Sequence, residues 1–457
     1  MKHLPKLGHL FGTNGIRGIP GKDLSPDVVS SVARAVAAKL GHPIVVGMDG
    51  RLSSPALKEL VVSSLLESGS DVVDVGMLPT PALQYYISRG RFGGGIMITA
   101  SHNPPEFNGL KVMGGNGVEV PRSVEKEIEK LVESKKPRKP VDRPGELRED
   151  RTGVEKYVAG VKSQVDVRSI KMKHFRIVVD AGNGMQALAV PQLLKELGAT
   201  VKCINCEVNG AFPGRGPEPT AEKLVNLSNQ VARGGYDLGV AFDGDGDRSV
   251  FCDERGMILT GDRSGSFLAE FLLRVKGKNK VVTTIATSSL ADWAVEPTGS
   301  ELIRTRVGSV DVTDTMIKEK ALVGFEENGG FFYLPHQPVR DGAMTLGLVL
   351  WALSYYGTAF SRCISRLPRL YQRKGKTQAP NEIKYKVVEE VAKSADGAVD
   401  TTDGAKVTQQ DGSWVLVRAS GTEPLIRVFS ESRVESEAEE LYKKYMLLVE
   451  QIIRKQR

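Results

Sequence analysis

The sequence predicts an α/β fold made of three repeated α/β modules with mixed, mainly parallel sheets, followed by a C-terminal α+β domain. Over residues 1–370, apolar runs rich in valine and isoleucine alternate with segments of helical periodicity. The order strand, helix, strand occurs three times, and each repeat ends in a further apolar strand and a polar loop. Parallel strands joined by right-handed helical crossovers produce this pattern.

The first module is expected at residues 1–150. Its elements are strands at 44–47, 71–75 and 96–98 and a helical segment that extends to about Ser68. The third strand ends in the loop Ser101-His102-Asn103-Pro104-Pro105, where two prolines prevent a strand or helix from continuing. Ser101 is thus presented at the end of a buried strand, where open α/β sheets place their chemistry. A capped turn without chemistry is the alternative interpretation.

The second module is expected at residues 151–256 and the third at 257–370. In the second module we expect strands at 177–180, 200–204 and 238–242 and a helix that ends near Leu197. In the third module we expect strands at 281–284 and 302–303 and a helix through Trp293. The final strands end in Asp-Gly-Asp-Gly-Asp at 243–247 and Glu-Glu-Asn-Gly at 326–329. The three modules would therefore aim three strand-end loops at one shared site.

The C-terminal domain is expected at residues 371–457. Its predicted elements are strands at 384–388 and 415–417 and an amphipathic helix over 435–454, which begins with glutamates and ends with basic residues as its dipole prefers. Between the sheet and this helix lies a loop with hydroxyl, amide and guanidinium groups suited to a phosphate. These groups belong to Arg418, Ser420, Gly421, Thr422 and Arg427. A plain turn with structural arginines is an equal alternative.

Asp243, Asp245 and Asp247 alternate with glycines directly after an apolar strand. Three carboxylates this close together in low dielectric need a counter-charge, and the glycines let the backbone turn their oxygens toward one point. Mg²⁺ is the natural partner if waters and phosphate oxygens complete its octahedron. A calcium EF-hand is disfavoured because Arg248 occupies the position that requires glycine, and the flanks resemble strands where helices are needed. A solvated acidic turn remains the alternative.

The composition indicates a globular protein with a small anionic substrate. Its net charge is +7, but the basic residues are dispersed, which disfavours a nucleic-acid partner. The longest apolar stretch, 347–356, is too short to span a membrane, and no leader-like segment opens the chain. Four cysteines suit a reducing compartment, so we expect a cytoplasmic protein. Cys203 and Cys206 form a Cys-x-x-Cys without a second pair and are interpreted as structural.

The four loops together resemble those of the α-D-phosphohexomutases, the superfamily of phosphoglucomutase, phosphomannomutase and phosphoglucosamine mutase. The matching motifs, in the family's order, are Thr-Ala-Ser-His-Asn-Pro-Pro at 99–105, Asp-Gly-Asp-Gly-Asp-Arg at 243–248, Phe-Glu-Glu-Asn-Gly at 325–329 and Arg-Ala-Ser-Gly-Thr-Glu-Pro at 418–424. Phe-Gly-Thr-Asn-Gly-Ile-Arg-Gly at 11–18 also resembles the family's first motif. The chain is most similar to archaeal-type members named phosphomannomutase/phosphoglucomutase or phosphoglucosamine mutase.

The resemblance implies four domains around a central cleft and a reaction that interconverts hexose 1- and 6-phosphates through a bisphosphate intermediate. It implies a phosphoserine at Ser101 and Mg²⁺ held by Ser101, Asp243, Asp245 and Asp247, with a hexose 1,6-bisphosphate as activator. The implied catalytic residues around them are Arg17, His102, Lys111 and Arg248. Glu326 and Asn328 would contact the sugar, and the loop of Arg418, Ser420, Gly421, Thr422 and Arg427 would grip the phosphate that is not reacting.

The third motif departs from the family pattern Gly-Glu-x-Ser-Gly-His, since Phe325, Asn328 and Gly330 replace glycine, serine and histidine. Ser309 also stands where some bacterial members carry a histidine. These departures leave Lys111 and Glu326 as candidates for the general base and leave the preferred sugar open between glucose or mannose and glucosamine phosphates. A Mg²⁺-dependent phosphatase or other phosphotransferase and a catalytically silent sugar-phosphate-binding protein are the alternative functions. We expect a monomer or homodimer.

Overall fold

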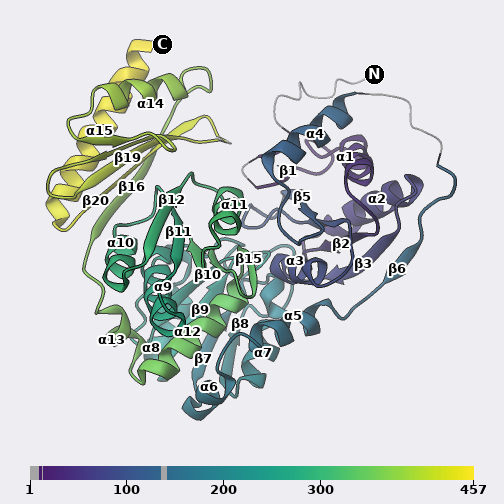
Figure 1. The fold of residues 1–457 in the computed structure, drawn as a ribbon, viewed down its shortest axis with the longest axis horizontal. Helices are drawn as coiled ribbons and strands as arrows, with labels where there is room; N and C mark the ends of the chain where they lie inside the picture. The colour runs from purple at the N-terminus through teal and green to yellow at the C-terminus, as the bar shows by residue number, and fades with distance from the viewer. Residues whose placement is uncertain (1–9, 13, 135–140, 422, 457) are drawn as a thin grey trace.

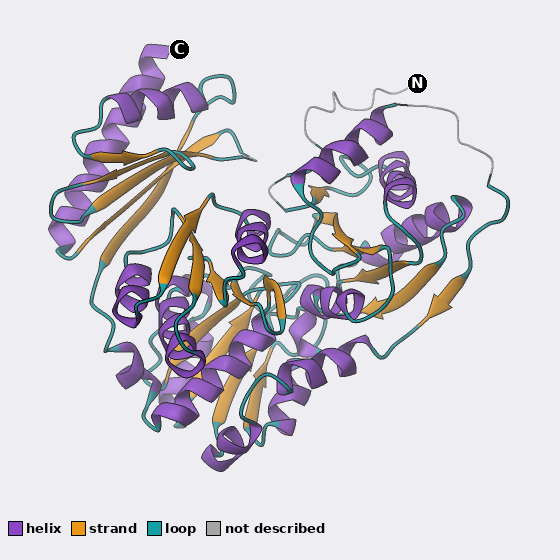
Figure 2. Ribbon diagram, viewed as in Figure 1, coloured by secondary structure: helices purple, strands orange, loops and turns teal. Residues whose placement is uncertain are grey.

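The computed structural model describes residues 10–12, 14–134, 141–421 and 423–456. Within these residues the chain forms four sheets, which follow one another along the sequence (Figure 1). Helices pack against each of the sheets (Figure 2). This arrangement confirms the predicted α/β class with three mixed, mainly parallel modules and a C-terminal α+β domain.

The first sheet carries the loop of Ser101. Its strands follow the order β1 (Ile16–Gly18), β5 (Asn108–Gly114), β4 (Gly94–Ile98), β2 (Ile44–Met48), β3 (Val72–Met77) and β6 (Leu147–Glu149). Strand β2 is parallel to β3 and β4, whereas β5 returns antiparallel to β4. The helices of this part are α1 (Pro26–Lys39), α2 (Ser54–Glu67), α3 (Thr80–Ser88) and α4 (Arg122–Glu133). Because β4 is buried and ends at Ile98, Ser101 follows it at the carboxyl edge of the sheet.

The second and third sheets repeat this order. Their strands are β10 (Ser249–Asp253), β9 (Leu238–Phe242), β7 (Arg176–Asp180) and β8 (Thr200–Ile204), and then β12 (Glu301–Thr305), β11 (Lys280–Thr284), β13 (Val323–Phe325), β14 (Phe331–Tyr333) and β15 (Gln337–Arg340). In each sheet the first strand of the repeat pairs in parallel with the other two, and an antiparallel strand follows. The threefold repeat predicted from the sequence is therefore real.

Helices and short 3₁₀ turns connect these strands. They are α5 (Gly153–Lys162), α6 (Val167–Lys173), η1 (Met185–Ala187), α7 (Val190–Glu196), η2 (Ala221–Lys223), α8 (Val225–Gly234), α9 (Gly261–Lys276), α10 (Leu290–Val295), η3 (Glu296–Thr298), α11 (Ser309–Glu319), α12 (Gly342–Tyr356) and α13 (Phe360–Ile364). The apolar helix α12 is buried over most of its length. One continuous apolar core contains side chains from all three modules, such as Val45, Val179 and Phe325. No helix of the described residues is long and apolar enough to cross a membrane.

The C-terminal domain has its own core and an antiparallel sheet. Its elements are β16 (Tyr371–Gln378), α14 (Lys384–Lys393), β17 (Ala398–Asp400), β18 (Ala405–Thr408), β19 (Trp414–Ala419), β20 (Leu425–Ser432) and α15 (Glu435–Gln456). The prediction of a strand at 384–388 was wrong, because these residues begin helix α14. Val387, Val388 and Val391 form a buried helical stripe there, which is the spacing of one helix face.

The prediction that the loop of residues 418–427 joins the sheet to the last helix was also wrong. This segment is a hairpin between the adjacent strands β19 and β20, and Arg418 lies directly opposite Arg427 in their register. Strand β20 escaped prediction because it contains polar residues at several positions, although most of its residues are buried. The hairpin places both guanidinium-bearing residues at one end of the sheet.

Candidate active site

Three loops from three different sheets meet at the carboxyl ends of their strands. The loop after β4 contacts the loop after β9, because the Ser101 hydroxyl donates a hydrogen bond to Asp243 Oδ2 over 2.9 Å. The loop after β9 contacts the loop after β13 through a backbone bridge between Arg248 and Gly330. The structure therefore brings together the three strand-end loops that the sequence repeat predicted to converge.

Ser101 is buried and has a left-handed backbone, with φ of +51°. A residue with a Cβ adopts this conformation only where surrounding contacts enforce it. The Ser101 N–H donates to Thr99 Oγ1 over 2.9 Å, and the Ser101 carbonyl accepts from Arg51 Nη2 over 2.8 Å. These contacts hold the hydroxyl toward Asp243, with His102 Nδ1 3.3 Å away on another side.

The three aspartates of the second loop form a buried cluster. One carboxylate oxygen from each of Asp243, Asp245 and Asp247 lies within 4.8 Å of the others. Two buried cations face this cluster. Lys111 Nζ donates to Asp245 over 2.7 Å and to Asp247 over 3.0 Å, and Arg340 Nη2 donates to Asp247 over 2.7 Å. These cations offset part of the negative charge that the cluster concentrates.

The aspartates differ in how their surroundings affect ionisation. Burial raises the pKa of Asp243 well above its usual value, and the neighbouring charges of Asp247 and Asp245 add to this. Burial acts the same way on Asp245, but the Lys111 ammonium outweighs it and the pKa of Asp245 lies below its usual range. Of these two, Asp243 is the carboxylate whose charge is less compensated by its neighbours.

The cluster fits a divalent cation. Among the described residues, Asp245 Oδ1 and Asp247 Oδ1 are buried without a hydrogen-bond partner. A buried carboxylate oxygen left without a donor is costly, and a hard cation with oxygen ligands removes that cost. Asp243, Asp245 and Asp247 are thus a donor set suited to Mg²⁺ or a similar ion.

Three further candidate groups surround Ser101. Arg17 Nη1 donates to the side chain of Asn103, and burial lowers the pKa of Arg17 to about 10, so its guanidinium remains charged at neutral pH. The Arg248 guanidinium, with burial second, holds the pKa of His102 far below its usual value. His102 is therefore neutral, whereas Arg17 is a cation beside it. The Arg248 N–H donates to Asp243 Oδ1 over 3.0 Å, which joins Arg248 to the acidic loop.

The third loop contributes Glu326 and Asn328. Burial raises the pKa of Glu326, with the nearby Arg340 opposing it at 3.6 Å. Glu326 Oε2 has no hydrogen-bond partner in the part of the chain that the structure describes. Asn328 Oδ1 accepts from the Gly330 N–H over 3.0 Å, so this side chain shapes the turn of its own loop.

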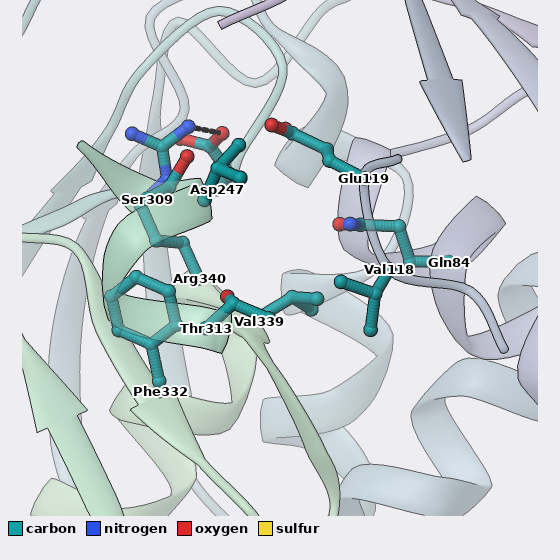
Figure 3. A pocket seen from close by; sticks show the side chains of 10 residues that line it. Gln84, Val118, Glu119, Asp247, Ser309, Thr313, Phe332, Val339 and Arg340 are labelled. Carbon is teal, nitrogen blue, oxygen red and sulfur yellow. Dashed lines mark hydrogen bonds and ion pairs between the residues drawn. The ribbon is translucent and has the colours of Figure 1, made fainter. Parts of the chain in front are cut away.

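A cavity opens beside the acidic loop, between the first and third modules. Figure 3 shows Glu119 and Gln84 on one wall and Arg340 and Ser309 on the other, with Arg340 bonded to Asp247. Ser309 begins helix α11, so its hydroxyl reaches this cavity from the third module. The cavity connects the acidic cluster with the boundary between the modules.

The hairpin of the C-terminal domain faces the third loop across a second cavity. Its lining includes Glu327 from the third loop together with Arg418 and Arg427. Ser420 is buried, and its hydroxyl accepts from the Glu423 N–H over 3.1 Å, whereas Gly421 is exposed. Thr422 lies outside the described residues. The predicted phosphate loop therefore faces the third loop across this cavity.

Family models cover nearly the whole chain. They describe phosphoglucomutase/phosphomannomutase α/β/α domains I, II and III, at residues 8–139, 155–256 and 260–371, and the C-terminal domain, at residues 382–448. The chain belongs to the phosphoglucomutase/phosphomannomutase family.

Curated relatives agree with this assignment. The chain is 40% identical to a phosphoglucomutase/phosphomannomutase of Thermococcus kodakarensis, covering 98% of this chain and 100% of the relative. It is 38% identical to a phosphoglucosamine/phosphogalactosamine mutase of Sulfurisphaera tokodaii, covering 97% of this chain and 100% of the relative. A crystal structure of a phosphoglucomutase/phosphomannomutase family protein from Burkholderia thailandensis is also similar. Its TM-score is 0.86 at 26% identity, covering 96% of both chains.

Three site residues of this phosphoglucomutase/phosphomannomutase family member were not among those predicted from the sequence. Arg340 binds Asp247, and Thr80 donates its hydroxyl to Asp245 over 2.6 Å. Arg51 holds the Ser101 carbonyl. The position of Arg51 three residues after the end of the buried strand β2 could have indicated it, since this is the edge where Ser101 also lies. Thr80 and Arg340 carry no such signal, because only the packing of distant elements brings them to the acidic loop.

Proposed function

We propose that this chain is a phosphohexomutase that interconverts hexose 1-phosphates and 6-phosphates through a phosphorylated Ser101 and a bound bisphosphate. One observation carries the proposal. In a member of this family, a buried serine hydroxyl donates to Asp243 within a cluster of three carboxylates that suits a divalent cation. Phosphoryl transfer requires a positioned oxygen and a concentrated positive charge, and the divalent cation would supply that charge.

In the proposed reaction, the phosphoryl group of Ser101 passes to a hydroxyl of the sugar monophosphate. The bond between phosphorus and Ser101 Oγ breaks, a bond to the sugar oxygen forms, and the proton that the sugar hydroxyl gives up balances the proton that Ser101 Oγ takes up. The bisphosphate then turns end for end, and its other phosphoryl group returns to Ser101. Mg²⁺ held by Asp243, Asp245, Asp247 and Ser101 would supply charge to neutralise the phosphoryl oxygens. A hexose 1,6-bisphosphate would load Ser101 in protein that lacks the group.

Positive side chains around Ser101 would hold the transferring group in line. Arg17 and Arg248 both act on His102 by lowering its pKa, and the low dielectric of a buried site strengthens the attraction of their charges for phosphoryl oxygens. Lys111 contacts two of the three aspartates through its ammonium, so its charge is already directed at the acidic loop. Its role is then to balance the carboxylates when the phosphate moves.

Glu326 is the better candidate for the general base. A sugar hydroxyl that attacks phosphorus must give up its proton, and the acceptor must have a free lone pair. The Lys111 ammonium donates hydrogen bonds to two carboxylates and offers no lone pair. Glu326 Oε2 is buried and accepts no hydrogen bond from the residues described, although the Arg340 guanidinium lies 3.6 Å from it. Asn328, on the same loop, would contact a ring hydroxyl.

The hairpin of the C-terminal domain would grip the distal phosphate. Arg418 and Arg427 stand opposite each other in the strand register and line one cavity with Glu327 of the sugar loop. Two guanidinium groups, the Ser420 hydroxyl, the Gly421 amide and the Thr422 hydroxyl offer donors of the type that binds phosphate oxygens. Binding the remote phosphate in this way can order the site and exclude water.

The proposal is tested by assaying purified protein with Mg²⁺ and a trace of hexose 1,6-bisphosphate. The 1-phosphates of glucose, mannose and glucosamine are supplied separately, and 6-phosphate and inorganic phosphate are both measured. We expect 6-phosphate from at least one sugar, none with Ser101→Ala, and a mass of one phosphoryl group on the wild-type protein alone. The ranking of rates names the sugar. Inorganic phosphate without 6-phosphate would indicate a phosphatase, and no product with Ser101 unphosphorylated would indicate a binding protein.

A further inference from the structure

Arg51 uses every donor of its guanidinium group. The side chain is fully buried, and its Nε donates to Asp49 Oδ2 over 3.1 Å. Its two terminal nitrogens donate to four backbone carbonyls that all belong to the loop after strand β4. The acceptors are Ser101 O at 2.8 Å, Asn103 O at 2.7 Å, Pro104 O at 2.7 Å and Phe107 O at 2.8 Å. The loop therefore wraps around one guanidinium plane.

These contacts belong to a closed ring of hydrogen bonds that includes Ser101. Asp49 accepts from Arg51 and also from the Thr99 hydroxyl, over 2.7 Å. Thr99 Oγ1 in turn accepts the Ser101 N–H. Both the N–H and the carbonyl of Ser101 are thus tied to the same Asp49–Arg51 pair, one on each side of its strained left-handed backbone. A rotation of this residue would break one of the two ties.

The ring is also fixed against the acidic loop. The Phe212 ring lies 5.1 Å from the Arg51 guanidinium carbon, and Phe212 comes from the second module. A Cβ at Gly244 would lie only 2.5 Å from the Ser101 carbonyl oxygen. That oxygen is therefore confined between the Arg51 guanidinium and the backbone of the aspartate loop. The position of Arg51 sets how Ser101 faces Asp243.

We propose that Arg51 is a positioning residue for phosphoryl transfer, which holds the Ser101 loop in the one backbone conformation that aims the serine oxygen at the acidic cluster. The proposal rests on the proposed role of Ser101 as phosphoryl carrier. Only arginine meets the geometry, because five donors in a rigid plane reach four carbonyls and a carboxylate at once. Lysine at this position keeps the charge but presents three donors from a single nitrogen, so it leaves buried carbonyls unpaired.

The test compares Arg51→Lys with a matched control, Arg304→Lys. Arg304 also binds three backbone carbonyls and an aspartate, but between the end of β11 and helix α10, at Thr284 O, Thr287 O, Ser288 O and Asp292. For each protein we would measure kcat, KM, the melting temperature, phosphorylation of Ser101 by intact mass, and inorganic phosphate released per sugar converted. The last ratio reports whether the phosphoryl group meets the sugar or water.

We expect Arg51→Lys to lower kcat by about 100-fold, because misplacement of a reacting group by about 1 Å has an effect of this size. KM should change by less than about threefold, since the distal phosphate grip is untouched. Phosphate released per sugar converted should rise. Arg304→Lys should lose thermal stability and keep the wild-type ratio. Thr99→Val removes the acceptor of the Ser101 N–H and should also raise the phosphate released per sugar converted. It replaces Arg51→Lys in the test if Arg51→Lys does not fold.

The outcomes separate this inference from the proposed function. A wild-type protein without mutase activity would overturn the proposed function itself. An active wild type with an unchanged kcat and an unchanged release ratio in Arg51→Lys would overturn the positioning role alone. A third outcome would also overturn the proposal. In it, both Arg51→Lys and Arg304→Lys lose kcat in proportion to their loss of stability, and neither changes the phosphate released per sugar converted. Arg51 would then act only in folding.

Discussion

Replacing Lys111 by methionine tests whether the acidic loop is built to hold a cation. The Lys111 ammonium lies 2.7 Å from Asp245 and 3.0 Å from Asp247, and all three side chains are buried. With an effective dielectric constant of about 20, Coulomb's law gives about 6 kcal/mol for each contact, and desolvation of the ammonium offsets several kcal/mol of this. Removing one partner from such a buried group costs about 3–5 kcal/mol. Methionine has a similar length, so the loss reflects charge more than volume.

We therefore expect the free energy of unfolding of Lys111→Met to fall by about 3–5 kcal/mol in the presence of a chelator, measured by urea denaturation. Mg²⁺ at 100 times its dissociation constant would stabilise the wild type by about 2.7 kcal/mol. Mg²⁺ should stabilise Lys111→Met by more than it stabilises the wild type, because the added cation also replaces the missing ammonium. The difference between the two proteins should thus narrow when Mg²⁺ is added.

A suitable control is Lys406→Met. Lys406 is also buried, but it donates to Ile285 O and lies over the Trp414 ring at the boundary of the C-terminal domain. Lys406→Met should change the free energy of unfolding by the same amount with chelator and with Mg²⁺. The reasoning fails if Mg²⁺ leaves the difference between wild type and Lys111→Met unchanged, or if it narrows the difference equally for Lys406→Met.

Three more predictions follow from single contacts. Thr80→Val removes the hydroxyl that donates to Asp245 over 2.6 Å, and should cost about 1.5–3 kcal/mol of stability by urea denaturation, as hydrogen bonds to charged groups do. Gly244→Ala should lower kcat while the protein stays folded by circular dichroism, because its Cβ would lie 2.5 Å from Ser101 O and displace the loop. Burial raises the pKa of Asp262 from 3.8 to about 6, so the folded protein favours the protonated carboxyl. The contribution of this group to the stability of the fold is therefore present below pH 3.8 and is lost as the pH rises through 6. Asp262→Asn should thus gain about 2.4 kcal/mol of stability relative to the wild type between pH 4 and pH 7, measured in melts across that range, and an unchanged difference between the two proteins would contradict this.

Much of the fold follows from local patterns in the sequence. Buried parallel strands are short apolar runs, and the helices between them keep the 3.6-residue period, so the three modules are visible without a structure. The C-terminal domain was harder to predict. At 384–388, two adjacent valines among charged residues suit a strand or a helix, and only the packing of Val387, Val388 and Val391 in that core decides for the helix.

The chain order of the motifs also indicated most of the candidate site. Ser101 and the aspartates each follow an apolar strand, and carboxyl ends of parallel strands collect loops at one edge. Lys111 was identified by family resemblance, since nothing in its own surroundings in the sequence marks it. Its contact with Asp245 spans 134 positions of the chain.

The sequence by itself determined the repeated modules, the serine loop and the run of carboxylates, because each depends on residues close together in the chain. Only the tertiary structure decided which cations balance those carboxylates and what holds the serine. Arg340 reaches Asp247 across 93 positions and Arg51 reaches Ser101 across 50. Such partners are selected by how whole modules pack on a shared core, and a buried charge takes whichever opposite charge or carbonyl that packing brings within hydrogen-bond distance.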